Sequence, residues 1–222
     1  MRLRVISTGS KGNCYLLEND TECLVIDCGI PFMEIKKAIG FQITKIVGCL
    51  VTHCHKDHSL ALADFERFGI PTLAPYKDEK TKARFGNFEI TAFENVHDVP
   101  CYGSYIKHPD MGTLVYATDT EYIKYRFSTA NHFLVEANYK MELVDTSIPN
   151  YEHVLRGHMS IETCCKFIAA SKSGNLRNVI LCHLSNGNSN GEIFLEEISR
   201  VWNGNTYIAK KGLEVDLQTT PF

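Results

Sequence analysis

The segment LVTHCHKDHS, residues 50–59, concentrates polar, ionisable side chains in a way that is unusual for a folded chain. Within six residues it holds three histidines and one aspartate: His53, His55, Asp57 and His58. An apolar, β-branched run over residues 46–51 precedes the cluster, and residues 59–68 carry apolar side chains at helical spacing. The pattern therefore predicts a buried strand that delivers the cluster to the start of a helix. Side chains that repel one another once charged make a poor core, so the cluster needs another explanation.

A bound metal explains this cluster better than chance does. Imidazole and carboxylate groups are ligands for zinc, manganese or iron. Residues i and i+2 of an extended segment point to the same side, so His53 and His55 can converge on one ion. Asp57 and His58 follow at the start of the helix and can reach a second ion, whereas Cys54 points away and is expected to be packed. With nine histidines in 222 residues, such a spacing arises in roughly one shuffled chain per thousand.

The composition narrows the classes of protein. A net charge of −3 and an isoelectric point near 6.3 leave no global basic field, so any nucleic acid must bind through a local patch. There is no signal peptide and no apolar run of the ~20 residues that a membrane span needs. The nine cysteines form no paired CxxC knuckles and sit mostly in apolar runs. The sequence therefore predicts a cytoplasmic protein with reduced, buried thiols.

Many short strands alternate with a few helices. The expected strands are residues 2–8, 14–18, 22–27, 46–51, 72–74, 88–93, 102–106, 113–117, 133–137, 178–182, 207–209 and 214–217. The expected helices are residues 31–40, 59–68, 160–171 with Ser160 as N-cap, and 191–202. The polar run KDEKTKAR, residues 77–84, is expected to be a solvated loop or short helix. The order of elements predicts one domain over residues 1–222, with two sheets flanked by helices.

The pattern H-x-H-x-D-H after a buried strand resembles the metallo-β-lactamase superfamily. Further motifs of that family occur in the same order: an aspartate closing LVID, a histidine after FEITAFENV, an aspartate in LVYATDT and a histidine in NVILCHLS, which are Asp27, His97, Asp119 and His183. The resemblance implies an α+β fold, a four-layer αβ/βα sandwich with a two-metal site along the sheet edges. It also implies that His53, His55 and His97 hold one ion, that Asp57, His58 and His183 hold the other, and that Asp119 bridges both.

The remaining histidines and Asp27 receive other roles. Asp27 is expected to hold the histidine loop by hydrogen bonds and not to bind metal. His108 competes with His97 for the lone-histidine position, and His97 fits better because it directly follows a strand. His132 and His153 have no matching context and are interpreted as ordinary, partly exposed histidines.

Within the superfamily, the landmarks are similar to those of the YycJ/WalJ-like branch. The later bridging residue is an aspartate, where the true lactamases carry a cysteine, and the intervals between ligands are too short for the β-CASP domain or for a tRNA-processing exosite arm. The branch landmarks are STGSKGN near the start, LVEANY, RGHMS and CHLSNGNSN, although Met159 stands where that branch has leucine. These motifs add His158 as a phosphate contact or leaving-group acid, and Ser10, Asn13, Glu136 and Asn138 as substrate contacts. The RGHMS histidine could instead be a helix-entry residue bonded to backbone.

The resemblance implies a 5′-to-3′ exonuclease acting on DNA through two divalent ions, zinc or manganese, with iron as an alternative. Asp57, Asp119 and His158 would be the catalytic side chains, and a hydroxide shared by the ions would attack phosphorus. Two alternatives remain open: a small-molecule hydrolase of the same fold, acting on a cyclic nucleotide or a thioester, and a non-catalytic metal-binding protein. A nuclease needs a basic strip beside the metals, for which the candidates are Lys11, Lys36, Lys37, Lys124, Arg126 and Arg156. No membrane partner is expected, and protein partners are not specified by the sequence.

Overall fold

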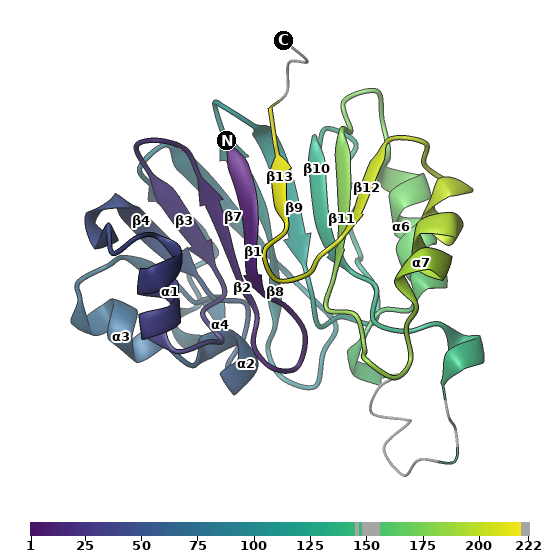
Figure 1. Ribbon diagram of the computed structural model, residues 1–222, viewed down its shortest axis with the longest axis horizontal. Helices are drawn as coiled ribbons and strands as arrows, with labels where there is room; N and C mark the ends of the chain where they lie inside the picture. The colour runs from purple at the N-terminus through teal and green to yellow at the C-terminus, as the bar shows by residue number, and fades with distance from the viewer. Residues whose placement is uncertain (145–146, 148–155, 219–222) are drawn as a thin grey trace.

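Two β-sheets stacked face to face form the centre of the computed structural model, which describes residues 1–144, 147 and 156–218 (Figure 1). The first sheet has the order β13–β1–β2–β3–β4–β5. Its strands are β1 (Arg2–Ser7), β2 (Cys14–Glu18), β3 (Cys23–Ile26), β4 (Ile46–Leu50), β5 (Thr72–Leu73) and β13 (Glu214–Asp216). The strands from β13 to β3 pair antiparallel, and β3, β4 and β5 pair parallel.

The second sheet has the order β12–β11–β10–β9–β8–β7–β6. Its strands are β6 (Lys82–Phe85), β7 (Phe88–Glu94), β8 (Tyr102–His108), β9 (Gly112–Ala117), β10 (His132–Glu136), β11 (Asn178–Cys182) and β12 (Asn205–Ile208). Strands β6 to β9 form an antiparallel meander, and β9 to β12 run parallel. In both sheets the parallel strands therefore end at a common edge.

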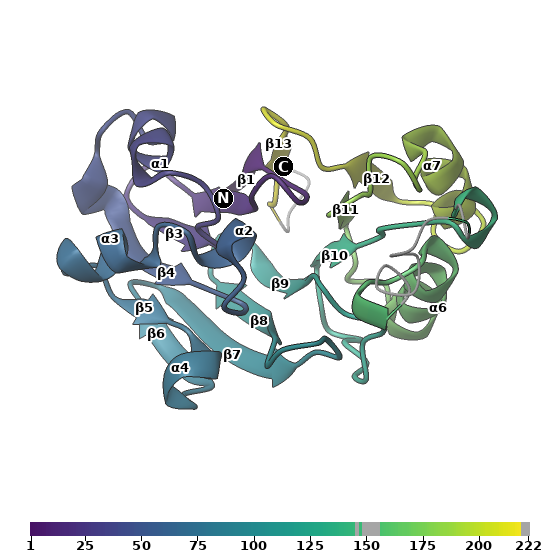
Figure 2. The ribbon, with the colours of Figure 1, turned by 90° about the horizontal axis from the view of Figure 1, so that it is seen from below.

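Helices cover the outer faces of the sheets (Figures 1 and 2). Beside the first sheet lie α1 (Phe32–Ala38), α2 (Lys56–Ser59), α3 (Leu62–Arg67) and α4 (Pro75–Asp78), and beside the second lie α6 (Ile161–Ser171) and α7 (Gly191–Ser199). Short 3₁₀ turns occur at Ile43–Lys45 and Met141–Leu143. Ser160 caps α6 by accepting a hydrogen bond from the Thr163 amide, as the sequence predicted.

Alternation along the strands divides the apolar side chains among three layers of packing. In β3, Leu24 and Ile26 face the other sheet, whereas Cys23 and Val25 face α1 and α3. In β9, Leu114 and Tyr116 likewise point between the sheets, and Val115 and Ala117 point toward α6. The predicted four-layer αβ/βα sandwich is confirmed.

Several local expectations were wrong. Residues 77–84 are not a loop throughout, because Lys82–Phe85 forms the edge strand β6, which buries Phe85 and exposes Lys82 and Arg84. The charges that disguised this strand are typical of sheet edges. The expected helix over residues 59–68 is two shorter helices, and the first begins at Lys56.

Two predictions about individual side chains also failed, and one falls outside the described residues. Cys54 is exposed, not packed, although all nine cysteines are free thiols as expected. His132 is fully buried because its ring bonds to the Met111 carbonyl at 3.1 Å and to the Asn178 amide at 2.9 Å. His153 lies among the residues that are not described.

A buried polar contact fastens the two sheets at the edge where β2 turns into β3. Glu22 accepts hydrogen bonds from His108 Nε2 at 3.0 Å, from Asn87 Nδ2 at 2.7 Å and from the Asn87 amide at 3.0 Å. Burial opposes ionisation of Glu22, but these donors outweigh it and lower the pKa of the carboxyl below its ordinary value. His108 is thus a structural residue of this clamp and not a rival to His97.

Across residues 1–144, 147 and 156–218, none of the helices combines the length and apolar character required to cross a bilayer.

Candidate metal centre

Residues from both sheets gather at the edge where the parallel strands end. Figure 2 looks onto this edge, which carries α2. Asp27 follows β3, the histidine cluster follows β4, and His97 follows β7. Asp119 comes two residues after β9, and His183 comes directly after β11. Segments that are far apart in sequence therefore deliver their side chains to one place, because parallel strands end on the same side of a sheet.

Three of these residues have an uncommon backbone conformation. Asp27, Asp119 and His183 have φ values of 53°, 50° and 54°, in the left-handed region. Aspartate and histidine tolerate this region better than branched residues do, and strained conformations persist where the surroundings hold them. Each of these turns redirects a side chain at the end of a strand toward the shared edge.

A first ligand group comprises His53, His55 and His97, each of which offers a nitrogen within 4.8 Å of the others. His97 Nδ1 donates to the Gly157 carbonyl at 3.0 Å, which leaves Nε2 free to face His55 at 3.5 Å. Burial, reinforced by nearby His58, lowers the pKa of His53 to about 3. A neutral imidazole keeps the lone pair that a cation needs.

A second ligand group comprises Asp57, His58 and His183. Asp119 lies beside both groups, since it clusters with His53 and His58 and also with His183. Its carboxylate oxygens lie 3.1 Å from His58 Nε2 and 3.8 Å from His183 Nε2. The arrangement of the described residues thus offers two neighbouring sets of ligands with one carboxylate between them.

The clearest evidence for a cation is an orphaned atom. His183 Nε2 is buried and has no hydrogen-bond partner among the described residues. It faces Asp57 Oδ2 at 4.0 Å and Asp119 Oδ1 at 3.8 Å, too far for a hydrogen bond to either. Burial alone would lower the pKa of His183, but Asp119 together with hydrogen bonds to Asp57 and Glu136 raises it to about 10. An atom with this surplus of negative neighbours fits a divalent ion, and the donor set suits zinc, manganese or iron.

Asp27 sits beneath the histidine loop, where the sequence placed it. It accepts hydrogen bonds from His58 Nδ1 at 2.7 Å, from the Thr52 amide at 2.9 Å and from the Tyr116 hydroxyl at 2.6 Å. The bond to Nδ1 fixes the His58 tautomer and turns Nε2 toward Asp119. Asp27 belongs to none of the ligand groups found among the described residues.

Glu136 at the end of β10 connects two histidines. Its Oε1 accepts from His158 Nδ1 at 2.7 Å and from His183 Nδ1 at 3.0 Å. Its Oε2 accepts from the amides of Thr120 and Met159, at 3.1 and 3.2 Å. The His158 ring stacks on the His183 ring, with centroids 5.2 Å apart. Burial opposes protonation of His158, but the negative charge of Glu136 outweighs it and raises the pKa of His158.

The four predicted substrate contacts occupy different positions. Glu136 and Asn138 are buried, and Asn138 Nδ2 donates to the His183 carbonyl at 2.7 Å. Asn13 is also buried, with its Nδ2 2.9 Å from His58 Nε2. We therefore propose that these three residues position the ligands. Ser10 is exposed on the turn before Asn13 and remains a candidate for contact with substrate.

Sequence reasoning missed the link from Glu136 to both His158 and His183. A signal for it was present, since β10 and β11 are adjacent parallel strands and Glu136 pairs in register with Cys182. Residues that end neighbouring parallel strands meet at one edge, so a carboxylate there was bound to lie beside His183.

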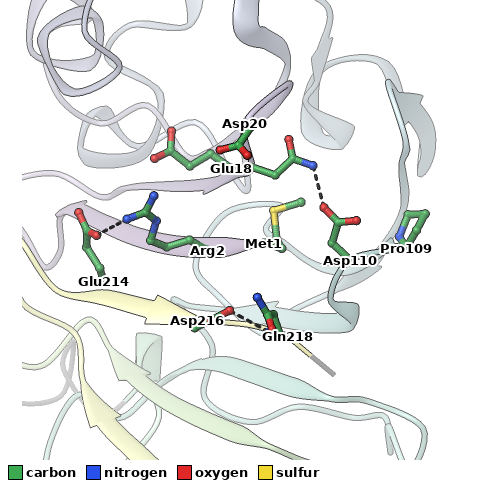
Figure 3. A pocket seen from close by; sticks show the side chains of 10 residues that line it. Met1, Arg2, Glu18, Asp20, Pro109, Asp110, Glu214, Asp216 and Gln218 are labelled. Carbon is green, nitrogen blue, oxygen red and sulfur yellow. Dashed lines mark hydrogen bonds and ion pairs between the residues drawn. The ribbon is translucent and has the colours of Figure 1, made fainter. Parts of the chain in front are cut away.

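The largest hollow on the described surface is not this site. It has a volume of about 890 Å³ and lies at the opposite edge, around the start of β1 (Figure 3). Carboxylates dominate its lining: Glu18, Asp20, Asp110, Glu214 and Asp216. It offers no imidazole, and its charge would repel a phosphate, so size does not identify the reactive centre here.

The fold and the ligand set define a metal-dependent hydrolase of the αβ/βα sandwich type. Residues 7–127 match the family model described as the metallo-beta-lactamase superfamily, and the chain belongs to that family. The chain is 25% identical over 237 residues to the exodeoxyribonuclease YycJ of Bacillus anthracis, a match covering 90% of this chain and 89% of that protein. It is 24% identical to the exodeoxyribonuclease WalJ of Streptococcus pneumoniae, over 85% of this chain and 83% of that one. The predicted resemblance to the YycJ/WalJ-like branch is confirmed.

Solved structures show the same fold. The metallo-beta-lactamase fold protein YhfI from Bacillus subtilis superposes with a TM-score of 0.71 at 21% identity, covering 96% of this chain and 98% of that one.

Proposed function

We propose that this protein is a phosphodiesterase with two divalent ions that removes nucleotides from the 5′ end of DNA. The single observation that carries the proposal is the pairing of two ligand groups about Asp119 at one open edge of the sandwich. The relatives named exodeoxyribonucleases, which match most of the chain, favour DNA over other diesters. The nine free cysteines fit a reducing compartment, so we place this activity in the cytoplasm.

The chain's own residues divide the work of holding the ions. His53, His55 and His97 would hold one ion and Asp57, His58 and His183 the other, with Asp119 shared between them. Zinc and manganese suit these ligands, with iron as an alternative. When bound, such ions make water a stronger nucleophile and offset negative charge on phosphate oxygens. Asp27 and Glu136 keep His58 and His183 in the tautomers that turn Nε2 toward the ions.

His158 is placed to give a proton to the leaving oxygen. Its Nδ1 is engaged by Glu136, so its Nε2 is the atom that can carry a transferable proton. Its side chain is 17% exposed, which leaves a route for substrate to reach it. Asp119 Oδ1 lies 3.5 Å from His158 Nδ1, so the acid and the shared carboxylate belong to one site.

A comparison of substrates tests the proposal. Purified protein loaded with zinc or manganese is incubated with 5′-labelled and 3′-labelled single-stranded and duplex DNA, and with bis(p-nitrophenyl) phosphate. The proposal expects release of mononucleotides from the 5′ end and turnover of the small diester. Turnover of the diester without any loss of DNA would refute the nuclease assignment.

A hydrolase of a nucleotide-sized molecule is the second candidate, for which one observation speaks. A hollow of about 340 Å³ beside His97, between Glu94 and Tyr102, has the size for such a substrate and no length for a polymer. In the same experiment, turnover of a cyclic nucleotide or a thioester with intact DNA would favour this candidate.

A further inference from the structure

The outward face of β6, β7 and β8 differs from the rest of the second sheet. The outward-facing residues of β7 and β8, such as Glu89, Thr91 and Lys107, are exposed, whereas α6 and α7 lie beside β10 to β12 (Figure 2). Segment 121–131, which begins two residues after Asp119, runs along this open face. The Glu121 amide donates to the Val96 carbonyl at 3.0 Å, beside His97. The face therefore starts at the metal centre.

Aromatic side chains follow one another along this face. Tyr122 and Tyr125 are 46% and 43% exposed. Tyr125 lies edge-on to Phe93, with centroids 5.5 Å apart, and Phe93 contacts Phe127 at 5.0 Å. Phe127 in turn stacks on Tyr105, at 5.8 Å and 16° between the ring planes. Single exposed rings are ordinary, but a connected row of rings that ends in exposed tyrosines at a reactive centre indicates a binding surface.

Basic side chains border the same row. Lys107 Nζ lies 5.6 Å from the centre of the Tyr105 ring. Tyr105 also lines a groove of about 610 Å³ together with Arg84, Asn87 and Lys107. The exposed cations on this face are Lys82, Arg84, Lys107, Lys124 and Arg126, against the carboxylates Glu89 and Glu94. Glu94 is itself near Lys124, at 3.9 Å.

The distribution of charge points in one direction. The whole chain is acidic, with a net charge of −3, yet its carboxylates concentrate around the hollow at the far edge. Pro109 lines both that hollow and the groove beside Lys107, so the acidic residues mark the end of the basic face. Between that end and the metal centre the path follows β8, whose seven residues span about 23 Å. That length accommodates several nucleotides of an extended strand.

We propose that this surface, here called the aromatic face and made of Phe93, Tyr105, Tyr122, Tyr125 and Phe127 with the bordering cations, binds single-stranded nucleic acid whose end lies in the metal centre. The proposal rests on the proposed function and names how its substrate is held. Bases stack on exposed rings regardless of sequence, and cations follow the phosphates. A duplex could not present its bases to these rings, so the strand must be unpaired over this stretch.

Binding is measured separately from cleavage. A fluorescein-labelled 20-nucleotide oligothymidine is titrated with the protein in excess chelator, over a series of salt concentrations, and fluorescence anisotropy reports affinity. Combined Tyr122→Ala and Tyr125→Ala substitutions are expected to weaken binding by about 5- to 100-fold. Combined Arg84→Glu and Lys107→Glu substitutions are expected to reduce the salt slope by about 1.4, at about 0.7 for each single-strand phosphate released.

The controls separate binding from folding and chemistry. Lys37→Glu, an equally exposed charge reversal on α1 in the opposite helical layer, is expected to leave affinity and salt slope unchanged. The four aromatic-face substitutions are expected to leave turnover of bis(p-nitrophenyl) phosphate within about twofold, because that substrate needs only the metal centre. The charge variants involve only exposed side chains, so they keep the proposal testable if loss of the tyrosines disturbs folding.

The outcomes distinguish this proposal from the proposed function. If the unaltered protein degrades DNA and the variants bind as tightly as before, the aromatic face is refuted and the nuclease assignment stands. If the unaltered protein neither binds nor degrades DNA, both fail. Weaker binding in both sets of variants, with diester turnover and the Lys37→Glu control unaffected, supports the aromatic face.

Discussion

Replacement of Glu136 by glutamine tests whether one buried carboxylate holds two site histidines in place. Glutamine has nearly the same shape but carries one acceptor oxygen and one NH₂ group. Glu136 Oε1 accepts from His158 and His183, and Oε2 accepts from the Thr120 and Met159 amides. Whichever way the amide is oriented, its NH₂ group faces two donors, so two hydrogen bonds are lost.

The size of the effect follows from those two bonds. Hydrogen bonds to a charged group contribute about 1.5–3 kcal/mol each, so Glu136→Gln should lower the free energy of unfolding by about 3–6 kcal/mol. For a chain of this length that corresponds to a fall in Tm of about 6–24 °C. Residues that orient a metal ligand typically contribute 10–100-fold to metal affinity, so the affinity for zinc should fall by about that factor.

Thermal unfolding in chelator, competitive zinc titration and diester turnover measure the three effects. Glu142→Gln is the matched control, since that side chain is 81% exposed and lies near only Lys140, at 3.6 Å. The control is expected to behave like the unaltered protein in each assay. A Glu136→Gln protein that melts within about 2 °C of the control and binds zinc as tightly would refute the role assigned to this carboxylate.

Three further results are expected. Asp119→Ala should remove both ions, as measured by metal analysis, and lower diester turnover by at least about 100-fold, because this carboxylate lies between the two ligand groups; a variant that keeps both ions would contradict that position. His158→Ala should keep its metal content but lose about 10²–10⁴-fold in DNA turnover, and less with bis(p-nitrophenyl) phosphate, whose leaving group needs no proton; loss of metal would show that His158 is a ligand instead. Because the folded pKa of Glu22 is depressed below 4.5, its contribution to stability is present above that pH and disappears as pH falls through the folded pKa; the difference in unfolding free energy between the unaltered protein and Glu22→Gln should therefore shrink steadily below about pH 4.5, and a constant difference would disprove the ionised clamp.

Sequence alone predicted the strands that carry the metal ligands, because these strands are buried and bounded by turn residues. The run before His53 became β4, and the run before His183 became β11 with the expected bounds. The seven expected ligands are close enough in space to form the two groups, with Asp119 beside both. The strand Lys82–Phe85 escaped detection because its exposed charges hide the alternation of Ala83 and Phe85.

Side-chain partners were harder to predict than elements. The burial of His132 depends on a carbonyl and an amide from other strands, which local sequence does not reveal. Glu136 and Asn138 resembled substrate contacts because they follow a strand, yet their partners turned out to be His158 and His183. Hydrogen bonds between distant segments decide such cases, and only tertiary structure supplies them.

The two edges of the sandwich are joined by different means. At one edge Glu22, Asn87 and His108 tie the sheets together with protein groups alone. At the other edge the groups facing one another across the sheets are ligands, with His53 and His58 on the first sheet and Asp119 on the second. Ions bound there would cross-link the sheets and stabilise the fold by about 2.7 kcal/mol at a free concentration one hundred times the Kd. The supply of metal would then govern how long the chain survives proteolysis as well as how fast it turns over, since without ions the sheets part first beside β4 and β9.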